Sequence, residues 1–407
     1  MKKIDVIVIG AGAAGLMAAG QAARAGKQVL VLERNKHPGR KLLLTGKGRC
    51  NVTNNCDIDT LIQNTYSGGR FLYSAFSRFT PQDLMDFFIS RGIPLKTERG
   101  RRVFPQSDRS ADILNALLSD CNNQNCQIIQ ARAESLLIRD GILSGVTDSD
   151  KKEHIALKVI VATGGMSYPA TGSTGDGYRL AKQAGHIITP PRPSLVPLEA
   201  RENWCGELAG LSLKNVTLTV FAANKLIFQE MGELLFTHFG LSGPLVLSAS
   251  AHMKQQQDYT LSIDLKPALT PEQLDKRFQR DFSETPNKDF SNALNKLLPA
   301  SLIPVMITLS GIKPDTKVHQ ITKPMRLQLG VLFKNLPLTF KRFRPIKEAV
   351  ITSGGVSLKE IDPKTMQSKL LSGLYFAGEV LDADAYTGGY NLQIAFSTAV
   401  AAAMGDL

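Results

Sequence analysis

The stretch GKGRCNVTN, residues 46–54, combines several residue types that can do chemistry. Its glycines allow backbone N–H groups to come close to a bound ligand. Lys47 and Arg49 can stabilise negative charge, and the Cys50 thiol is protonated near neutral pH and can donate a proton. The alternative is a basic surface loop in which Cys50 is buried and behaves as a small apolar side chain. The choice between the two depends on the elements that position the loop.

A strand, a glycine turn, a helix and a second strand precede this loop. Residues 4–9 form a short apolar run of the kind expected for a parallel strand covered on both faces. An alanine-rich helix follows, and a second strand over residues 28–32 ends at Glu33. Gly10, Gly12 and Gly15 lie between the first strand and the helix, which is the context that the G-x-G-x-x-G pattern requires.

This unit predicts a dinucleotide site. The first two glycines allow a tight turn and let a pyrophosphate approach the helix N-terminus, whose dipole favours negative charge. Glu33, at the end of the second strand, would accept hydrogen bonds from the hydroxyls of an adenosine ribose. The alternative is a chance start of a helix rich in glycine and alanine.

Length and charge set the bounds on the rest of the chain. With 407 residues the chain exceeds what one hydrophobic core usually supports, so we expect two or three packed units. The 48 Lys and Arg residues against 36 Asp and Glu residues give a net charge of +12, which favours phosphate-rich partners unless the basicity serves solubility alone. Two lysines before the first apolar run can mimic a signal peptide or membrane anchor, but Asp5 and the regular glycines argue against both.

The cysteines point to the cellular compartment. They are five in number and form no CxxC pair, so we expect neither a disulfide framework nor a metal site. This usage is typical of a reducing cytoplasm, and we expect no membrane association.

The predicted architecture changes at a proline cluster, residues 189–198. Before it, Thr80 caps a helix that Gly92 closes, Asp140-Gly141 joins two strands in a hairpin, and residues 158–162 form another buried strand. After it, residues 212–222 and 225–228 are typical of strands in a β-rich unit, and Thr270 begins a helical stretch that lasts to about residue 302. The chain ends in strands, glycine turns and a small-residue helix.

Loop motifs beyond the G-x-G-x-x-G pattern show a more specific resemblance to a known family. The chain resembles the BaiN/RdsA family of bacterial FAD-dependent oxidoreductases over essentially its whole length, through GAGAAG, GRKLLLTGKGRCNVTN, RVFPQS, ATGGMSYPATGSTGDGY, ELLFTHFGLSGP and GLYFAGEVLDADAYTGGYNLQ. The resemblance implies an α/β fold with a discontinuous, Rossmann-like FAD-binding domain, residues 1–190 and 345–407. It also implies a β-rich inserted domain at 191–265 and 322–344, a helical inserted domain at 266–321, and non-covalent FAD.

The residues themselves also favour FAD over NAD as the resident nucleotide. A strand near residues 375–379 runs into a glycine turn, and a helix that begins near Asn391 could face the flavin. A second G-x-G-x-x-G unit is absent, so NAD(P)H would dock transiently as reductant. From the fingerprint, the terminal segments and the resemblance together, the expected cofactor-binding residues are Gly10, Gly12, Ala14, Gly15, Glu33, Arg34, Arg40, Lys41, Gly46, Asn51, Ala133, Gly165, Gly378, Glu379, Asn391 and Leu392.

The resemblance also suggests a reaction. Members of the family are associated with reduction of conjugated carbon–carbon double bonds, in bile-acid intermediates and in a uracil of large-subunit ribosomal RNA, and one relative oxidises amines. Such a reduction needs a hydride from the flavin, a donor that polarises the carbonyl and a general acid. Cys50 is the first candidate for the acid, followed by His238 and Tyr168 as carbonyl polariser or acid, although Cys50 and His238 are also typical of structural residues.

We therefore expect an FAD-dependent reductase that forms dihydrouridine in bacterial 23S ribosomal RNA, with NAD(P)H as ultimate reductant. The alternatives are a small-molecule ene-reductase or amine oxidase, and a flavin-carrying RNA-binding or assembly protein. Two basic runs would bind RNA phosphates if they face the cofactor, or are otherwise solvated faces. They comprise Arg91, Lys96, Arg99, Arg101 and Arg102 in the first run and Lys341, Arg342, Arg344 and Lys347 in the second.

Overall fold

The structure is a computed structural model that describes residues 3–122, 125–254 and 256–405. The chain forms two compact units. Unit 1 comprises Met1–Ser194 and Pro345–Leu407, and unit 2 is the inserted segment Leu195–Arg344. Each unit is described by itself below.

A five-stranded parallel sheet is the centre of unit 1, in the order β20-β11-β1-β2-β7. Its two edges hold β20 and β7, and β1 lies in the middle because it pairs with both β2 and β11. The chain moves from β1 to β2 on one side and returns later to β11 on the other, so a topological switch point lies between β1 and β11. Ligands of such sheets bind at the carboxyl ends of the strands next to the switch point. The strands are β1 Val6–Ile9, β2 Val29–Glu33, β7 Cys126–Gln130, β11 Lys158–Val161 and β20 Leu374–Phe376.

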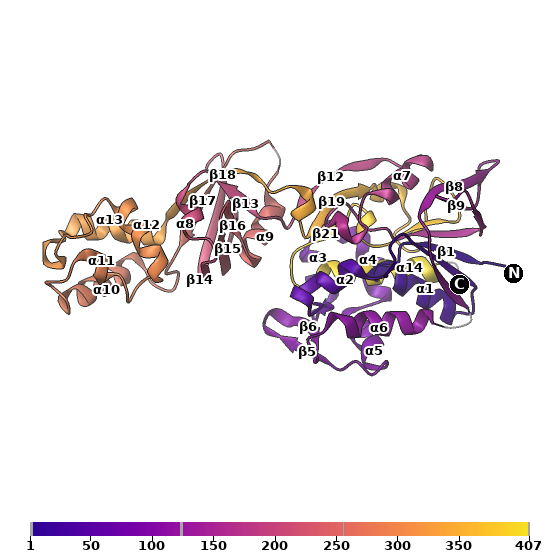
Figure 1. The fold of residues 1–407 in the computed structure, drawn as a ribbon, viewed down its shortest axis with the longest axis horizontal. Helices are drawn as coiled ribbons and strands as arrows, with labels where there is room; N and C mark the ends of the chain where they lie inside the picture. The colour runs from indigo at the N-terminus through magenta and orange to yellow at the C-terminus, as the bar shows by residue number, and fades with distance from the viewer. Residues whose placement is uncertain (1–2, 123–124, 255, 406–407) are drawn as a thin grey trace. The chain divides into compact units, whose positions relative to one another are not determined.

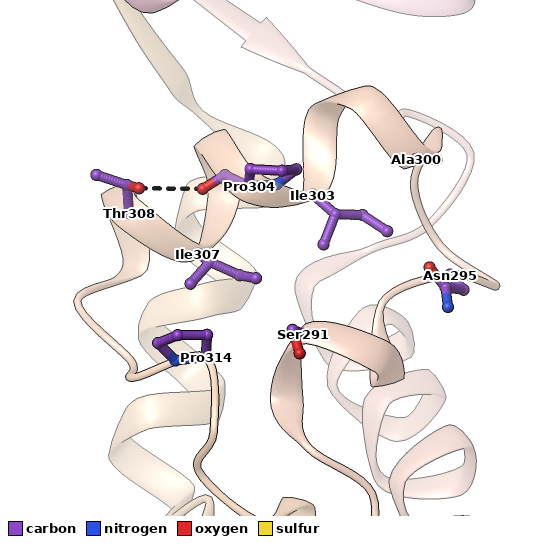
Figure 2. A pocket seen from close by; sticks show the side chains of 8 residues that line it. All are labelled: Ser291, Asn295, Ala300, Ile303, Pro304, Ile307, Thr308 and Pro314. Atoms are coloured by element: carbon purple, nitrogen blue, oxygen red, sulfur yellow. Dashed lines mark hydrogen bonds between the residues drawn. The ribbon is translucent and has the colours of Figure 1, made fainter.

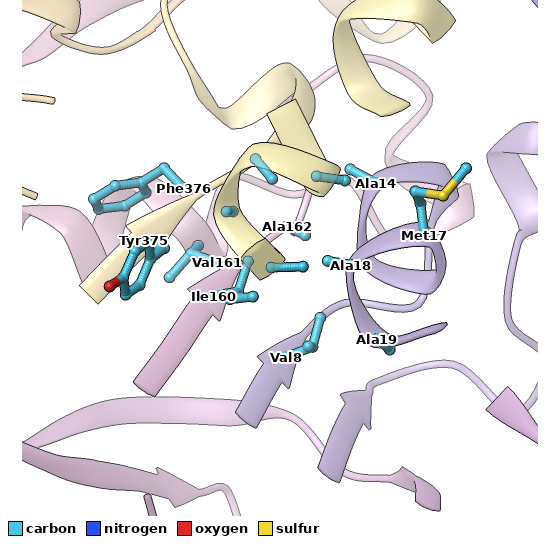
Figure 3. Close-up of a cluster of buried hydrophobic side chains, with 14 of the residues drawn as sticks. Val8, Ala14, Met17, Ala18, Ala19, Ile160, Val161, Ala162, Tyr375 and Phe376 are labelled. Atoms are coloured by element: carbon cyan, nitrogen blue, oxygen red, sulfur yellow. The ribbon is translucent and has the colours of Figure 1, made fainter. Parts of the chain in front are cut away.

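Two helices from opposite ends of the chain pack beside this sheet. They are α1 (Ala13–Arg24) and α14 (Tyr390–Met404), and they also pack against each other. Figure 3 shows Ala14 and Ala18 of α1 in one apolar cluster with Val8, with residues 160–161 of β11 and 375–376 of β20, and with Ala162 just after β11. Small side chains bring the backbones close, which is why both helices are rich in alanine and why α14 is buried along most of its length.

The remaining elements of unit 1 form short sheets and surrounding helices (Figure 1). The expected helix start at Thr80 is confirmed, because Thr80 and Asp83 form a capping box, although α5 ends at Ile89, before Gly92. The hairpin at Asp140-Gly141 is also confirmed, with both residues left-handed. The helices are α2 Arg40–Leu44, α3 Ile58–Gln63, α4 Gly69–Arg78, α5 Pro81–Ile89, α6 Ser110–Cys121 and α7 Asp176–Gln183.

The short sheets of unit 1 are β3-β6-β5, β10-β9-β8, β12-β19 and β21-β4. Part of the proline cluster forms β12, so the chain stays in unit 1 as far as Ser194. The strands are β3 Thr53–Asn54, β4 Thr65–Ser67, β5 Leu95–Glu98, β6 Arg102–Pro105, β8 Ala133–Arg139, β9 Ile142–Asp148, β10 Glu153–Ile155, β12 Ile188–Ser194, β19 Ile351–Val356 and β21 Asp384–Ala385.

Unit 2 contains a closed barrel, in the order β13-β16-β15-β14-β17-β18 (Figure 1). Closure gives each barrel strand a neighbour on both sides, although β15 pairs with β16 only over residues 235–237. The strand expected at residues 225–228 is longer, since β15 continues to Thr237. The barrel strands are β13 Leu198–Ala200, β14 Ser212–Ala222, β15 Lys225–Thr237, β16 Gly240–Ser242, β17 Tyr259–Asp264 and β18 Leu336–Phe343.

The helical part of unit 2 shares its hydrophobic core with the barrel. Phe278 and Phe333 of the helices belong to one buried cluster with Ile263 and Leu336 of the strands. Residues 195–344 form one compact unit, which includes most of the β-rich and helical inserted domains that the resemblance implies. The helices are α8 Trp204–Glu207, α9 Pro244–His252, α10 Pro271–Ser283, α11 Phe290–Ala293, α12 Ile303–Ser310 and α13 Lys323–Lys334.

Over the part of the chain that the structure describes, no helix combines the length and apolar character needed to cross a membrane.

Candidate cofactor and active site

The glycine turn after β1 is built for close backbone approach. Gly10 is left-handed, and a Cβ placed on it would lie 2.7 Å from the carbonyl oxygen of Ala162 at the end of β11. A Cβ on Gly15 would lie 1.8 Å from the Gly10 carbonyl oxygen. By contrast, a Cβ on Gly12 would meet no atom within 4 Å. The first and third glycines therefore serve packing, and the second leaves open space at the N-terminus of α1.

Glu33 lies at this turn, at the end of β2. Its carboxylate accepts hydrogen bonds from the backbone N–H of Ala11 at 2.7 Å and from the backbone and side chain of Asn35, both at 2.8 Å. These donors fix the buried carboxylate beside the glycines. A carboxylate has about four lone-pair sites, so it keeps acceptor capacity for a ribose hydroxyl.

Two buried polar atoms near the expected cofactor have no hydrogen-bond partner among the described residues. They are the hydroxyl of Thr163, which follows β11, and the side-chain oxygen of Asn51. Buried polar groups are usually paired, so the orphaned Thr163 hydroxyl just after β11 and the orphaned Asn51 oxygen in the loop at residues 46–54 suit a polar ligand. Together with the space beside Gly12 and the carboxylate of Glu33, they fit a dinucleotide such as FAD.

The loop at residues 46–54 contains four residues with left-handed backbone geometry. They are Gly46, Lys47 and Cys50, at φ near 60°, and Gly48, at φ 85°. Arg49 points to the β5–β6 hairpin, where it bonds Asp108 at 2.7 Å, pairs with Glu98 and stacks 4.1 Å above the Phe104 ring. Arg49 thus ties this loop to the hairpin, while Lys47 stays exposed.

Cys50 has no exposed surface and belongs to the hydrophobic core of unit 1. Burial raises the pKa of its thiol to about 12, against a smaller lowering by a hydrogen bond with Thr45. A thiol in this setting is protonated at neutral pH, but it packs as an apolar group. The structure therefore favours the packing alternative for Cys50.

Lys41 and Glu379 were expected at the cofactor individually, and the structure brings them together. The Lys41 ammonium donates to the Glu379 carboxylate and to the Ser167 hydroxyl, each at 2.6 Å. The same carboxylate accepts from Ser167 and from the backbone N–H of Thr352, each at 2.9 Å. A Cβ on Gly165 would lie 2.4 Å from the Thr352 hydroxyl, so only glycine fits beside this network.

Sequence reasoning did not single out Ser167 or Thr352. Ser167 lies within the glycine-rich segment after β11, which could have drawn attention to it. Thr352 carries no such signal, because its role comes from a backbone N–H and a hydroxyl that accepts from the N–H of Met166 at 2.8 Å.

Three further expected residues lie around the end of β2. Arg34 hydrogen-bonds Thr174 and pairs with Asp176 at 3.0 Å, which joins the end of β2 to the start of α7. Arg40 donates to the side chain of Asn35 at 3.3 Å. Ala133 is buried at the start of β8.

The start of α14 supplies the other side of the expected site. Gly378 is left-handed, and a Cβ on it would lie 2.9 Å from the Cβ of Ala14, so this turn and α1 need small residues at the same point. The Asn391 side chain bonds the backbone N–H and carbonyl of Ala385, at 2.9 and 2.7 Å. Asn391 therefore orders the preceding loop, while Leu392 is half-buried on the first turn of α14.

Tyr168 and His238 lie in different units. Tyr168 follows β11, is 36% exposed and has a left-handed backbone with φ of 49°. Such a conformation is rare for a bulky residue. His238 is exposed at the turn between β15 and β16 of unit 2, with its ring against Phe239.

The two basic runs divide into paired and unpaired cations. Arg91 pairs with Asp120 at 2.6 Å, and Lys96 pairs with Asp108 at 2.7 Å. In the second run, Arg342 and Arg344 both bind the carboxylate of Glu199 at 2.7 Å. Across residues 3–122, 125–254 and 256–405, no ion pair is found for the exposed side chains of Arg99, Arg101, Arg102, Lys341 and Lys347.

Unit 2 has an open pocket of about 480 Å³ in its helical part (Figure 2). None of its lining residues has a titratable side chain or a thiol, so the pocket is suited to binding rather than to catalysis. The lining residues are Ser291, Asn295, Ala300, Ile303, Pro304, Ile307, Thr308 and Pro314. Within the described residues, no three His, Cys, Asp or Glu side chains are grouped to hold a metal ion.

The parallel sheet, the glycine turn, the buried Glu33 carboxylate beside it and helix α14 are typical of a Rossmann-type, FAD-dependent oxidoreductase. The family described as HI0933-like protein Rossmann domain matches residues 4–405, and the chain belongs to this family. The predicted resemblance to BaiN/RdsA flavoproteins is confirmed.

Relatives match over nearly their whole length. The chain is 34% identical to the ribosomal RNA dihydrouridine synthase of Escherichia coli (strain K12), covering 99% of this chain and 98% of the relative. It is 35% identical to the Haemophilus influenzae enzyme of the same name, covering 98% and 97%. It is 30% identical to the 3-dehydro-bile acid delta(4,6)-reductase of Clostridium scindens, covering 96% of each.

Solved structures share the fold at low sequence identity. The 3-ketosteroid delta1-dehydrogenase of Sterolibacterium denitrificans has a TM-score of 0.52 at 13% identity, covering 100% of this chain and 99% of that one.

Proposed function

We propose that this protein reduces a uridine of bacterial 23S ribosomal RNA to dihydrouridine, with NAD(P)H as the ultimate reductant. The observation that carries the proposal is the full-length similarity, at 34% and 35% identity, to two enzymes named ribosomal RNA dihydrouridine synthase. A substrate of this kind would place the enzyme in the bacterial cytoplasm.

The reaction requires one hydride at C6 of the uracil and one proton at C5. When bound, FAD supplies the hydride and accepts two electrons from NAD(P)H after each turnover. In this proposal Glu33 and the open N-terminus of α1 hold the nucleotide half of the cofactor. Lys41 and Glu379 fix the loop after β11 against α2 and β19, so that the polar groups at this edge keep their orientation.

Tyr168 is the proton donor that the geometry favours. It lies in the loop that follows β11, a strand whose carboxyl end is where ligands of this fold bind, and its side chain is exposed, whereas Cys50 is enclosed. Its left-handed backbone stores strain, which proteins retain mainly where a side chain must be held for function. His238 remains the alternative donor.

The test uses purified holoenzyme, NAD(P)H and 23S RNA freed of ribosomal proteins, with nucleosides analysed by mass spectrometry. Formation of dihydrouridine, and its loss in Tyr168→Phe with FAD still bound, would support both the reaction and the acid. A Tyr168→Phe variant with wild-type turnover would remove Tyr168 from the mechanism. RNA that binds tightly without any base changing mass would instead indicate an RNA-binding or assembly role.

A small-molecule reductase is the second candidate, because the bile-acid reductase is 30% identical over 96% of this chain. Turnover of a conjugated enone that does not change with salt, without dihydrouridine formation, would favour it. RNA reduction should instead weaken steeply as salt displaces phosphate contacts.

A further inference from the structure

One group of positively charged side chains in unit 1 is exposed and forms no ion pair among the described residues. Residues 99–102, the connection between β5 and β6 together with the first residue of β6, form the arginine turn. Arg99, Arg101 and Arg102 are exposed, and no ion pair among the described residues involves them. Their neighbours Arg49 and Lys96 are neutralised by Glu98 and Asp108. The free positive charge of the hairpin therefore lies at its tip.

The backbone of the arginine turn is held in a strained form. Arg101 is left-handed at φ 58°, directly after the left-handed Gly100. An L-residue in this region costs about 1 to 2 kcal/mol, and turns usually place Gly, Asn or Asp there. The backbone N–H of Asn55 donates to the Arg101 carbonyl at 2.7 Å and helps to hold the conformation.

Asn54 connects the arginine turn to the start of α14. Its buried side-chain amide donates to the Gly100 carbonyl at 2.9 Å and to the Gly388 carbonyl at 3.1 Å. Gly388 and Gly389 form the turn from which α14 begins, and a Cβ on Gly389 would lie 2.3 Å from the carbonyl carbon of Thr53. One side chain thus links the tip of the hairpin to the turn beside the expected flavin.

We propose that the arginine turn binds the phosphate backbone of the RNA substrate, and that Asn54 is a positioning residue that fixes this contact relative to the N-terminus of α14. The inference rests on the proposed function and refines it. Guanidinium groups form charge-assisted hydrogen bonds with phosphate oxygens. A uridine must leave its stack to meet a flavin, so a phosphate contact at a fixed distance from the cofactor would help to place the extruded base.

The first test measures RNA binding. Holoenzyme is titrated into a fluorescein-labelled single-stranded oligouridylate at several salt concentrations, and anisotropy gives the affinity. Changing Arg99, Arg101 and Arg102 together to alanine should weaken binding at low salt and lower the slope of log affinity against log salt by about 2, since each single-strand phosphate contact contributes about 0.7. A matched variant with the exposed Lys151, Lys152 and Lys182 changed to alanine should keep the wild-type slope.

A wild-type slope in the triple arginine variant would overturn the phosphate contact. If the same variant also has a raised KM for NAD(P)H in anaerobic flavin reduction, the phosphates of the nicotinamide cofactor would be the ligand instead. If the wild-type protein binds RNA through the arginine turn but forms no dihydrouridine, the reaction assigned above fails while the RNA contact stands.

The second test isolates Asn54 in the Asn54→Ala variant, which keeps all three arginines. RNA should bind with the wild-type salt slope, but the change that RNA binding causes in the flavin absorption spectrum should be smaller, and kcat should fall more than KM rises. Melting temperature and FAD content control for folding. A variant that matches the wild type in spectrum and in kcat would overturn the positioning role.

Discussion

The glycine turn offers a prediction that separates packing from cofactor binding. Gly12→Ala and Gly15→Ala each add one methyl group, three residues apart. The added Cβ of Gly12→Ala has no atom within 4 Å, and Gly12 has a φ of −83°, which alanine adopts readily. The added Cβ of Gly15→Ala would lie 1.8 Å from the Gly10 carbonyl oxygen, where real Cβ atoms keep at least 3.0 Å.

The two substitutions should therefore change stability in opposite directions. Gly15→Ala should disturb packing, and Gly12→Ala should disturb cofactor binding. Gly15→Ala forces α1 away from β1, and such overpacking should lower the free energy of unfolding by about 3 kcal/mol. In a unit of this size that corresponds to a melting temperature about 6 to 12 °C lower. Gly12→Ala reduces the entropy of the unfolded chain, so FAD-free protein should melt at the wild-type temperature or slightly above it.

Gly12→Ala should weaken FAD binding even though it leaves the stability of the FAD-free protein unchanged or slightly raised. If the pyrophosphate approaches the N-terminus of α1 at this glycine, the methyl group should raise the dissociation constant of FAD about tenfold, equivalent to about 1.4 kcal/mol. FAD-depleted protein is melted by differential scanning fluorimetry and titrated with FAD by fluorescence quenching. Wild-type affinity in Gly12→Ala would refute the assigned approach, and wild-type melting in Gly15→Ala would refute the packing.

Three other predictions follow from single contacts. Arg91→Ala should lower the free energy of unfolding in urea by about 2 kcal/mol, because it leaves the largely buried Asp120 with a weaker partner, yet it should keep the salt slope of RNA binding. Burial lowers the pKa of His186 despite its hydrogen bond to Glu360, so the unfolded state binds more protons than the folded state as the pH falls. The free energy of unfolding should therefore decrease from about pH 7 to about pH 5. In urea titrations, His186→Gln should make this decrease smaller. Cys50→Ala should cost about 1 to 2 kcal/mol in thermal unfolding with turnover retained, and lost turnover at unchanged stability would restore Cys50 as the acid.

The fold of unit 1 could be predicted from local sequence because its signals are local. The β-branched run before Gly10, the glycine spacing and the acid at the end of β2 lie within residues 4–33, and each needs only its neighbours to be interpreted. The capping boxes at Thr80 and Thr270 are likewise complete within four residues. Closure of the barrel could not be predicted, because it depends on pairing between β13 and β18, which are far apart in the chain.

The candidate site was less predictable, because its contacts join distant segments. Lys41 and Glu379 are 338 positions apart, and nothing in either local sequence indicates the other. The burial of Cys50 is similar, since the loop around it is basic and the core that encloses it comes from other elements. Composition showed the residue types of the site, but not which cations would already be paired.

Pairing changes what a run of basic residues means. In the first run, Arg91 and Lys96 lie in the same stretch of sequence as the arginine turn, yet each is held by a carboxylate and supports the fold. A phosphate that approached either of them would first have to displace that carboxylate. Among the described residues no carboxylate forms an ion pair with the arginine turn, where Asp57 and Glu98 act on Arg101 and Arg102 only from a greater distance. The net charge of +12 therefore overstates the surface open to nucleic acid, and the unpaired cations beside the start of α14 are the ones whose removal should change RNA binding.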